Sequence, residues 1–207
     1  MLQNTSKKSI YKRLPIYLDF CKELKLKEPE TKHISSTRIA EELFLGEVQV
    51  RKDLSNICGK GKPKVGYNLE SLINSIEEYL KCKVKKNAII IGVGQLGSAI
   101  YGCDEFIKYG LNIIAGFDKD INDKKIQKPL YIFNQEKLKE FTENNKVDVA
   151  ILCVPKVVAQ DVCNLVVNSG INVIWNFTPT RLRVPEDVIV KTENLAYSVS
   201  VMLSEIN

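Results

Sequence analysis

The stretch NAIIIGVGQLGS, residues 87–98, decides the fold of this chain. Four apolar residues, 88–91, run directly into Gly92, Gly94 and Gly97. A short unbroken apolar run is typical of a parallel strand that is buried on both faces. In a G-x-G-x-x-G pattern the first glycine makes a tight turn, the second admits a pyrophosphate, and the third lets a helix pack closely. The stretch therefore predicts a strand, a phosphate-binding turn and the N-terminus of a helix.

A second apolar run, residues 111–117, indicates which dinucleotide the predicted turn binds. It ends at Asp118, roughly twenty residues after Gly97, where an acid that binds the ribose is expected. A carboxylate at this point accepts hydrogen bonds from the ribose 2′-hydroxyl and repels a 2′-phosphate. We therefore expect NAD(H) as the cofactor rather than NADP(H). The alternative is that Asp118 caps a strand and binds no ligand.

Strand and helix patterns alternate after Asp118, which is the signature of a parallel α/β sheet. A lysine-rich excursion, residues 119–128, comes first, and Trp175 lies in a later apolar strand and is expected in the core. The predicted strands are 130–133, 147–154, 172–177 and 187–190, and the predicted helices are 135–144, 159–169 and 195–206.

Open α/β sheets bind ligands at the carboxyl ends of their strands, so the residues that follow the strands should line the nucleotide pocket. The predicted nucleotide contacts are Gly92, Val93, Gly94, Gln95, Leu96, Gly97, Asp118, Lys119, Val154, Pro155, Phe177 and Thr178.

The first third of the chain has the pattern of a helix-turn-helix. Apolar residues recur at helical spacing over 11–26, and Pro15 is expected in the first turn, where its missing N–H costs little. Two short helices follow at 36–45 and 47–56, joined by a tight turn that contains a glycine, with a serine as N-cap of the first.

A glycine-rich basic segment, 59–67, follows and predicts a wing, before another helix at 68–80. Residues 51–64 hold five basic side chains against one acid, Asp53, which makes an electrostatic footprint for a phosphate backbone. The alternative is a solvated loop. The predicted DNA contacts are Ser35, Ser36, Thr37, Gln49, Val50, Arg51, Lys52, Lys60, Lys62 and Lys64. Of these, Gln49, Arg51 and Lys52 are expected to reach base edges, and the serines, Thr37 and the wing lysines are expected to bind phosphates.

Composition excludes several classes of protein. The 207 residues are 44% hydrophobic, with a net charge of +5 and no apolar run of membrane-spanning length. The six cysteines are scattered, without a C-x-x-C pair and with a single histidine, so neither a disulfide framework nor a metal site is expected. We therefore expect a cytoplasmic protein without a signal peptide.

Eight short motifs occur in a diagnostic order. They are RLPIY at 13–17, ISS at 34–36, VRKDLS at 50–55, VGY at 65–67, GVGQLG at 92–97, FD at 117–118, NF at 176–177 and RLRVP at 181–185. In these motifs the chain resembles the Rex family of redox-sensing transcriptional repressors, and its GKPK wing resembles that of the clostridial members.

The resemblance implies an α/β protein with a winged helix-turn-helix domain at 1–81, a Rossmann-like NAD(H)-binding domain at 82–193, and a C-terminal helix at 194–207. It implies a homodimer in which that helix is swapped into the partner. It also implies binding to a palindromic operator in double-stranded DNA, which NADH weakens, whereas the NAD⁺ form is compatible with DNA.

Three positions depart from the family pattern. Asp19, Cys103 and Asn194 stand where members usually carry an arginine, a tyrosine and an aspartate, which are understood to contact one another differently in the two states. These interdomain switch positions predict a weakened or altered redox response. An alternative is a DNA-binding protein whose Rossmann domain is only a dimerisation scaffold. A thiol sensor at Cys103 is a further alternative.

Two other classes remain to be weighed. A small NAD-dependent oxidoreductase needs an acid or base near the nicotinamide, and the strand ends offer Cys153, Val154, Pro155 and Thr178, with Lys156 and Tyr197 as further possibilities. The chain also lacks room for a substrate domain, so we expect no enzyme. A CoA-type nucleotide-binding domain would explain the sequence from residue 87 onward but not the wing.

Overall fold

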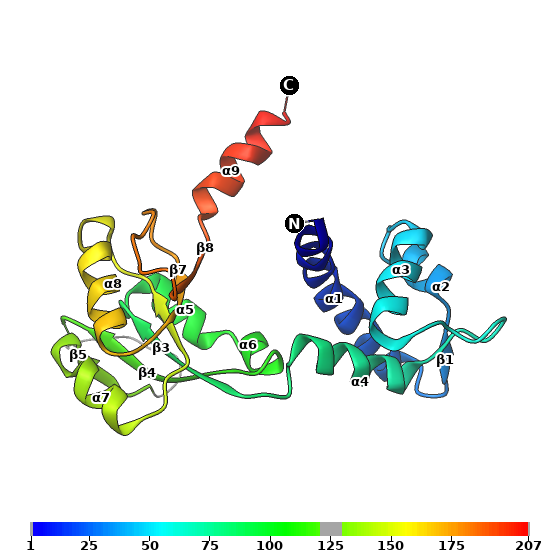
Figure 1. The fold of residues 1–207 in the computed structure, drawn as a ribbon, viewed down its shortest axis with the longest axis horizontal. Helices are drawn as coiled ribbons and strands as arrows, with labels where there is room; N and C mark the ends of the chain where they lie inside the picture. The colour runs from blue at the N-terminus through cyan, green and yellow to red at the C-terminus, as the bar shows by residue number, and fades with distance from the viewer. Residues whose placement is uncertain (1, 121–129, 207) are drawn as a thin grey trace. The chain divides into compact units, whose positions relative to one another are not determined.

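The computed structural model describes residues 2–120 and 130–206, so most of the predicted lysine-rich excursion lies outside the described residues. The chain divides into two compact units, Met1–Val84 and Lys85–Asn207 (Figure 1). The division falls within the lysine-rich stretch that follows the last predicted N-terminal helix. Each unit is described by itself.

Unit 1 is a winged helix-turn-helix. Its elements are α1 (Leu2–Lys27), β1 (His33–Ile34), α2 (Ser36–Glu42), α3 (Glu47–Cys58), β2 (Tyr67–Asn68) and α4 (Leu69–Leu80). β1 and β2 pair in antiparallel fashion, with Ile34 opposite Tyr67. The predicted helices are present, but β1 was not expected, because a strand of two residues carries no periodic signal.

The first helix is longer than the sequence predicted. α1 begins at Leu2, so Pro15 lies inside the helix and not in its first turn, which corrects the expectation. An interior proline removes one backbone hydrogen bond, and the helix is held in spite of it by a buried apolar face that includes Leu14, Tyr17 and Leu18.

A buried carboxylate fixes α3 to α1. Asp53, which is 2% exposed, accepts hydrogen bonds at 2.6 and 2.9 Å from the Arg13 guanidinium. It also accepts bonds at 2.9 Å from the Tyr17 hydroxyl and at 2.8 Å from the Gln49 amide. Burial alone would raise the pKa of Asp53, but these three donors lower it below its ordinary value of 3.8. The ionised form is therefore part of the folded unit.

Unit 2 alternates strands and helices, as predicted. Its elements are β3 (Lys86–Ile91), α5 (Gln95–Gly102), α6 (Glu105–Lys108), β4 (Leu111–Asp118), β5 (Ile132–Asn134), the 3₁₀ turn η1 (Gln135–Lys137), α7 (Leu138–Asn144), β6 (Val149–Leu152), the 3₁₀ turn η2 (Lys156–Val158), α8 (Ala159–Asn168), β7 (Val173–Asn176), β8 (Ile189–Thr192) and α9 (Leu195–Ser204). In the described residues the strands form one parallel sheet in the order β5-β4-β3-β6-β7-β8.

The unbroken apolar run of β3 is explained by burial on both faces of this sheet. Ile89 and Ile91 pack into one apolar cluster, and Ala88 and Ile90 pack into a second. All four side chains are fully buried. Trp175 packs against the second cluster and meets the ring of Phe106 edge to face, at a centroid distance of 5.2 Å, so it belongs to the core as expected.

The strand order places the ligand edge of the sheet. From β3 the chain builds outward through β4 to β5, then crosses back and builds outward on the other side through β6, β7 and β8. The order therefore reverses between β3 and β6, and ligands bind at the carboxyl ends of the strands on either side of such a reversal. The glycine turn that follows β3 lies at this point.

The Asp53 contacts generate a stability prediction. Asp53→Asn keeps the size of the side chain but removes its charge, and should lower the free energy of unfolding of unit 1 by about 2 kcal/mol near neutral pH. Urea unfolding, monitored by the hydrogen exchange of peptides from α3, measures the free energy of unfolding of this unit alone. Glu23→Ala, which removes an exposed ion pair with Lys27, is the control and should cost less than about 0.5 kcal/mol.

The same variant predicts a pH dependence. The folded protein lowers the pKa of Asp53, so the contribution of the carboxylate is complete above 3.8 and is lost as the pH falls through the lower folded pKa. The difference between wild type and Asp53→Asn should be constant between neutral pH and about pH 5 and then shrink in acid. A difference that grows in acid would contradict this assignment.

Candidate functional site

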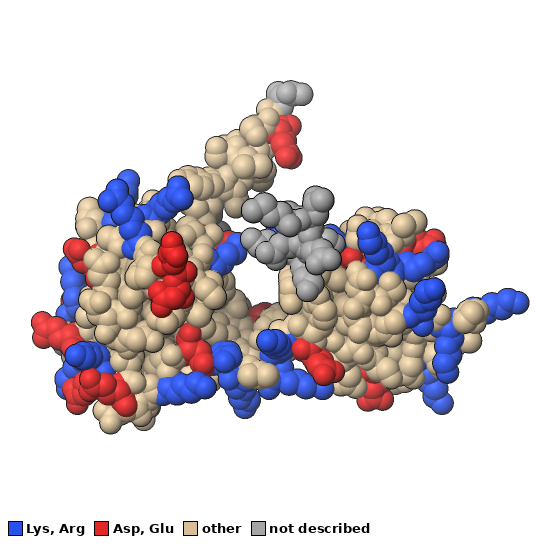
Figure 2. Space-filling model, in the orientation of Figure 1, with Lys and Arg blue, Asp and Glu red and all other residues tan. Residues whose placement is uncertain are grey.

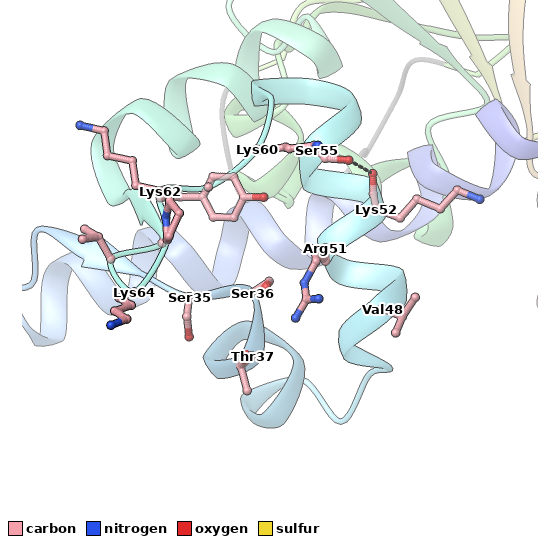
Figure 3. A pocket seen from close by; sticks show the side chains of 15 residues that line it. Ser35, Ser36, Thr37, Val48, Arg51, Lys52, Ser55, Lys60, Lys62 and Lys64 are labelled. Atoms are coloured by element: carbon pink, nitrogen blue, oxygen red, sulfur yellow. Dashed lines mark hydrogen bonds between the residues drawn. The ribbon is translucent and has the colours of Figure 1, made fainter.

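A groove on unit 1 joins α2, α3 and the segment 60–67, which we call the wing. It encloses about 720 Å³ between these three elements (Figure 3). In Figure 3 Arg51 extends from α3 toward the start of α2, and Lys62 and Lys64 extend from the wing. The lining residues are Ser35, Ser36, Thr37, Val48, Arg51, Lys52, Ser55, Lys60, Gly61, Lys62, Pro63, Lys64, Val65, Gly66 and Tyr67.

The groove is strongly basic. Five of its fifteen lining residues are lysine or arginine, and none of the fifteen is acidic. Figure 2 shows basic side chains along the edge of unit 1 where the wing projects. The nearest acid on α3 is Glu47, whose carboxylate contacts the Arg51 guanidinium one turn away. A concave surface of one sign attracts the phosphate backbone of a nucleic acid.

The wing is a tight loop that only certain residues can form. Lys62 and Gly66 exchange two backbone hydrogen bonds, at 2.9 and 2.8 Å. Gly66 has a φ of +87°, and a Cβ there would lie 2.3 Å from the Ile34 carbonyl oxygen, so no larger residue fits. The Tyr67 ring packs beneath Gly61, where a Cβ would lie 3.0 Å from the ring. These contacts hold the wing lysines beside α2.

The start of α2 carries three hydroxyl groups into the groove. Ser35 is the N-cap of this helix, and its hydroxyl oxygen accepts a hydrogen bond at 3.0 Å from the Arg38 amide. Ser36 and Thr37 follow in the first turn. Hydroxyls placed beside lysines can donate to phosphate oxygens.

The structure places eight of the ten predicted DNA contacts in this groove, and two elsewhere. Val50 is fully buried in the core of unit 1, which removes its side chain from the candidate contacts. Gln49 is exposed, but it lies outside the groove lining and its amide nitrogen donates to Asp53. The reason is helical geometry, because Val50 lies on the side of α3 opposite Arg51 and Lys52, and Gln49 lies at the flank of their face, where its amide reaches Asp53 one turn later.

Sequence reasoning missed two residues of α3 that line the groove. Val48 and Ser55 share the face of Arg51 and Lys52, at a spacing of i, i+3, i+4 and i+7. That spacing, counted three residues back and four residues forward from Arg51, was the signal that could have found them.

The second candidate site is the glycine turn at the end of β3. Gly92 has a φ of +92°, and a Cβ there would lie 2.6 Å from the carbonyl oxygen of Cys153. A Cβ on Gly97 would lie 2.2 Å from the Gly92 carbonyl oxygen, so this glycine allows α5 to pack on the turn. Gly94 is different, because it is exposed and a Cβ there would meet nothing within 4 Å. The open backbone at Gly94 fits the approach of a phosphate group.

Asp118 lies beside this turn at the carboxyl end of β4. One carboxylate oxygen accepts a hydrogen bond at 2.8 Å from the Val93 amide, and the other accepts one at 3.1 Å from the Asp120 amide. Asp118 thus links the glycine turn to β4. The Val93 side chain is 1% exposed and packs in the core, so only its backbone is placed at the turn. Gln95, Leu96 and Lys119 are exposed.

The remaining predicted nucleotide contacts, which follow β6 and β7, differ in their exposure to solvent. Pro155 is exposed and Val154 is partly exposed, both just after β6. Phe177 packs on Trp175, with ring centroids 4.7 Å apart. Thr178 is 1% exposed, and its hydroxyl donates to Asn176 at 2.7 Å, so this side chain shapes the loop after β7.

The three interdomain switch positions lie on three different elements. Asp19 is an exposed residue of α1, and Cys103 is the C-cap residue of α5. Asn194 is the N-cap of α9, and its side-chain oxygen accepts hydrogen bonds from the Ala196 and Tyr197 amides, at 3.0 and 3.2 Å. Asn194 therefore has a local role in starting the terminal helix.

Within residues 2–120 and 130–206, no group of three or more histidine, cysteine or acidic side chains is arranged to hold a metal ion. Across the same residues, no helix has the length and apolar character needed to span a bilayer.

Comparison with known proteins gives two matches to family models. Residues 8–55 match a putative DNA-binding protein N-terminus, and residues 83–180 match a CoA binding domain. The first match spans the helix-turn-helix, and the second spans the sheet from β3 to β7.

Curated relatives cover most of the chain. The redox-sensing transcriptional repressor Rex of Treponema denticola is 42% identical over 188 residues, which is 89% of this chain and 88% of the relative. The Rex protein of Caldanaerobacter subterraneus subsp. tengcongensis is 39% identical over 204 residues, covering 95% of this chain and 89% of the relative.

Solved structures of a Rex-family repressor are also similar to this chain over most of its length. The crystal structure of RSP in complex with β-NAD⁺ and operator DNA is 37% identical, with a TM-score of 0.87 over 97% of this chain and 92% of that one. The complex of RSP, a Rex-family repressor, with β-NADH is 36% identical, with a TM-score of 0.81. These matches confirm the predicted fold, and they favour a transcriptional repressor over a dehydrogenase. The chain belongs to the Rex family of redox-sensing transcriptional repressors.

Proposed function

We propose that this chain represses transcription by holding operator DNA in the basic groove of unit 1, and that NADH bound at the glycine turn of unit 2 weakens that hold. The observation that carries the proposal is the presence of both sites in one chain. A groove with five basic and no acidic lining residues lies on a helix-turn-helix, and an open Gly94 turn beside Asp118 lies on a Rossmann-like sheet.

On the DNA side, the groove separates two kinds of contact. Arg51 and Lys52 lie on α3, the second helix of the helix-turn-helix, which in this motif enters the major groove. Lys60, Lys62 and Lys64 lie on the wing, and the hydroxyls of Ser35, Ser36 and Thr37 lie at the start of α2. The wing and the hydroxyls bind phosphates and set the register, and α3 reads bases.

On the nucleotide side, the backbone of the glycine turn holds the pyrophosphate of NAD(H). Asp118 binds the ribose and keeps the Val93 amide in place, which fixes the turn. When bound, the dinucleotide reports the redox state of the cell through its nicotinamide ring. NADH releases DNA only to the extent that it binds the DNA-incompetent state better than the competent one.

A homodimer is supported by the terminal helix. Residues 196–206, which comprise most of α9 and the two residues after it, are all exposed, although most of them are apolar. The largest apolar side chains among them are Tyr197, Val199, Val201, Met202, Leu203 and Ile206, each at least half exposed. Burying such a helix against a second copy would remove this surface from water. A two-fold dimer also matches a palindromic operator. We infer the cytoplasm as the compartment of the protein.

A second candidate is the same repressor with a reduced redox response. The observation that favours it is the residues at the switch positions. Cys103 cannot donate and accept like a tyrosine hydroxyl, and Asn194 is neutral where the family usually has an acid. The NADH titration below separates the two candidates.

Removing wing lysines should reduce the salt dependence of DNA binding. Each phosphate neutralised contributes a slope of about −0.9 to log K against log salt on B-DNA. The double variant Lys60→Ala with Lys62→Ala should therefore flatten the slope by about 1.8 per bound subunit. Fluorescence anisotropy at several salt concentrations measures it. Lys27→Ala, which lies outside the groove, should leave the slope unchanged, and equal slopes for all three proteins would contradict the assignment.

NADH should release the operator from Gly94→Ala only at a concentration about tenfold or more above that needed for wild type. Gly94 has an ordinary backbone conformation, with φ −86° and ψ −158°, and its Cβ would meet no protein atom, so the alanine variant should fold normally. The methyl group would lie where the phosphate approaches and should weaken NADH binding by about tenfold or more.

Anisotropy of a labelled operator, titrated with NADH and separately with NAD⁺, provides the readout. Operator affinity without nucleotide should be equal in wild type and Gly94→Ala. Release of the variant at the same NADH concentration as wild type would place the nucleotide elsewhere. Indifference of wild type to both nucleotides would favour the second candidate.

Asp118→Asn should erode the preference for NADH over NADPH. The asparagine oxygen can still accept the Val93 amide, so the turn keeps its shape. Loss of the negative charge removes the repulsion of a 2′-phosphate. We expect the dissociation constant for NADPH divided by that for NADH to fall by about tenfold. Nucleotide fluorescence measures both constants. An unchanged ratio would show that Asp118 only anchors the turn.

A further inference from the structure

One apolar side chain stands exposed on the DNA-reading face of α3. Val48 is 78% exposed, in the first turn of the helix, and lines the basic groove. The other α3 residues in that lining are Arg51, Lys52 and Ser55, all of them polar. Valine is a poorer helix former than alanine, so this residue improves neither the helix nor the core. Its side chain is therefore open to contact by whatever enters the groove.

The two polar neighbours of Val48 in the chain are hydrogen-bonded to other side chains of α3. The Glu47 carboxylate contacts Arg51, and the Gln49 amide donates to the buried Asp53. Asp53 is in turn fixed by Arg13, so the orientation of this turn is set before DNA arrives. Gln49 is exposed beside it, but Val48 is the residue of the first turn of α3 that lines the groove.

The chemistry of a valine narrows what it can read. It has no hydrogen-bond donor or acceptor in its side chain, so it cannot recognise the polar edge of any base. In the major groove the apolar group that distinguishes the bases is the C5-methyl of thymine. The N-terminal residues of a recognition helix are those that reach base edges.

We propose that Val48 packs against the C5-methyl group of a thymine in each operator half-site and is a specificity-determining residue. This inference rests on the proposed function, because it requires the groove to bind double-stranded DNA. It adds a position at which sequence is read by apolar contact alone. Arg51 and Lys52 supply the hydrogen bonds one turn later on the same face.

The test replaces each operator thymine in turn by deoxyuridine, which removes the methyl group and leaves base pairing intact. The operator is a duplex selected from random DNA by the purified full-length protein. Wild type, Val48→Ala and Val65→Ala are compared by fluorescence anisotropy. Val65 is the matched control, because it is the other valine that lines the groove and it lies on the wing.

For wild type, one thymine per half-site should be sensitive. Its replacement should weaken binding by about fourfold, which corresponds to about 0.8 kcal/mol for one buried methyl group. Val48→Ala removes the contact in both half-sites, so it should bind the thymine operator about sixteenfold more weakly and lose sensitivity at that position, whereas Val65→Ala should keep it. Because Val48 is exposed and alanine favours helices, the variant should fold.

The possible outcomes distinguish a failure of the Val48 contact from a failure of the proposed function. Tight, selective DNA binding with no thymine sensitive to methyl removal overturns the role of Val48 and leaves the repressor function standing. The same conclusion follows if Val48→Ala keeps the wild-type sensitivity. Failure to bind any duplex overturns the proposed function and the role of Val48 together.

Discussion

The buried carboxylate of Asp53 is the constraint on which the DNA-binding unit depends. A charged group that is 2% exposed is tolerated only when it is paired and hydrogen-bonded, and here two side chains of α1 and one of α3 provide this. The pairing fixes the rotation of α3 about its own axis. That rotation turns Val50 into the core and turns the face of Arg51 and Lys52 toward the wing. One buried ion pair therefore decides which residues can read DNA.

A steric constraint plays the same part in unit 2. Gly92 and Gly97 are required because backbone atoms approach to within 2.6 and 2.2 Å of where a Cβ would lie, whereas Gly94 is surrounded by open space. Two of the three glycines thus build the turn, and the third leaves room for a ligand. Asp118 connects this turn to β4, so the carboxylate that we propose to select the ribose also supports the proposed phosphate-binding turn.

The sequence predicted the architecture more fully than the sites. Periodicity and glycine spacing located the helix-turn-helix, the wing and the strands of the sheet, because each is encoded locally. The errors concern which way single residues face. Val50, Val93 and Thr178 lie in segments that were located correctly, yet their side chains are buried. Burial of this kind depends on tertiary packing, such as that of Val93 against Gly116, a residue 23 positions later in the chain, which no local pattern reveals.

The two sites are formed by separate compact units, each with its own buried core. Neither site needs the other in order to fold, so the coupling between them cannot reside in the groove or in the glycine turn alone. It has to arise in a difference between two states of the whole protein, each favoured by one of the two ligands. Linkage then requires reciprocity, because any factor by which NADH weakens operator binding must equal the factor by which the operator weakens NADH binding. A repressor that answers to redox state must therefore hold NADH less tightly on its operator than free of it.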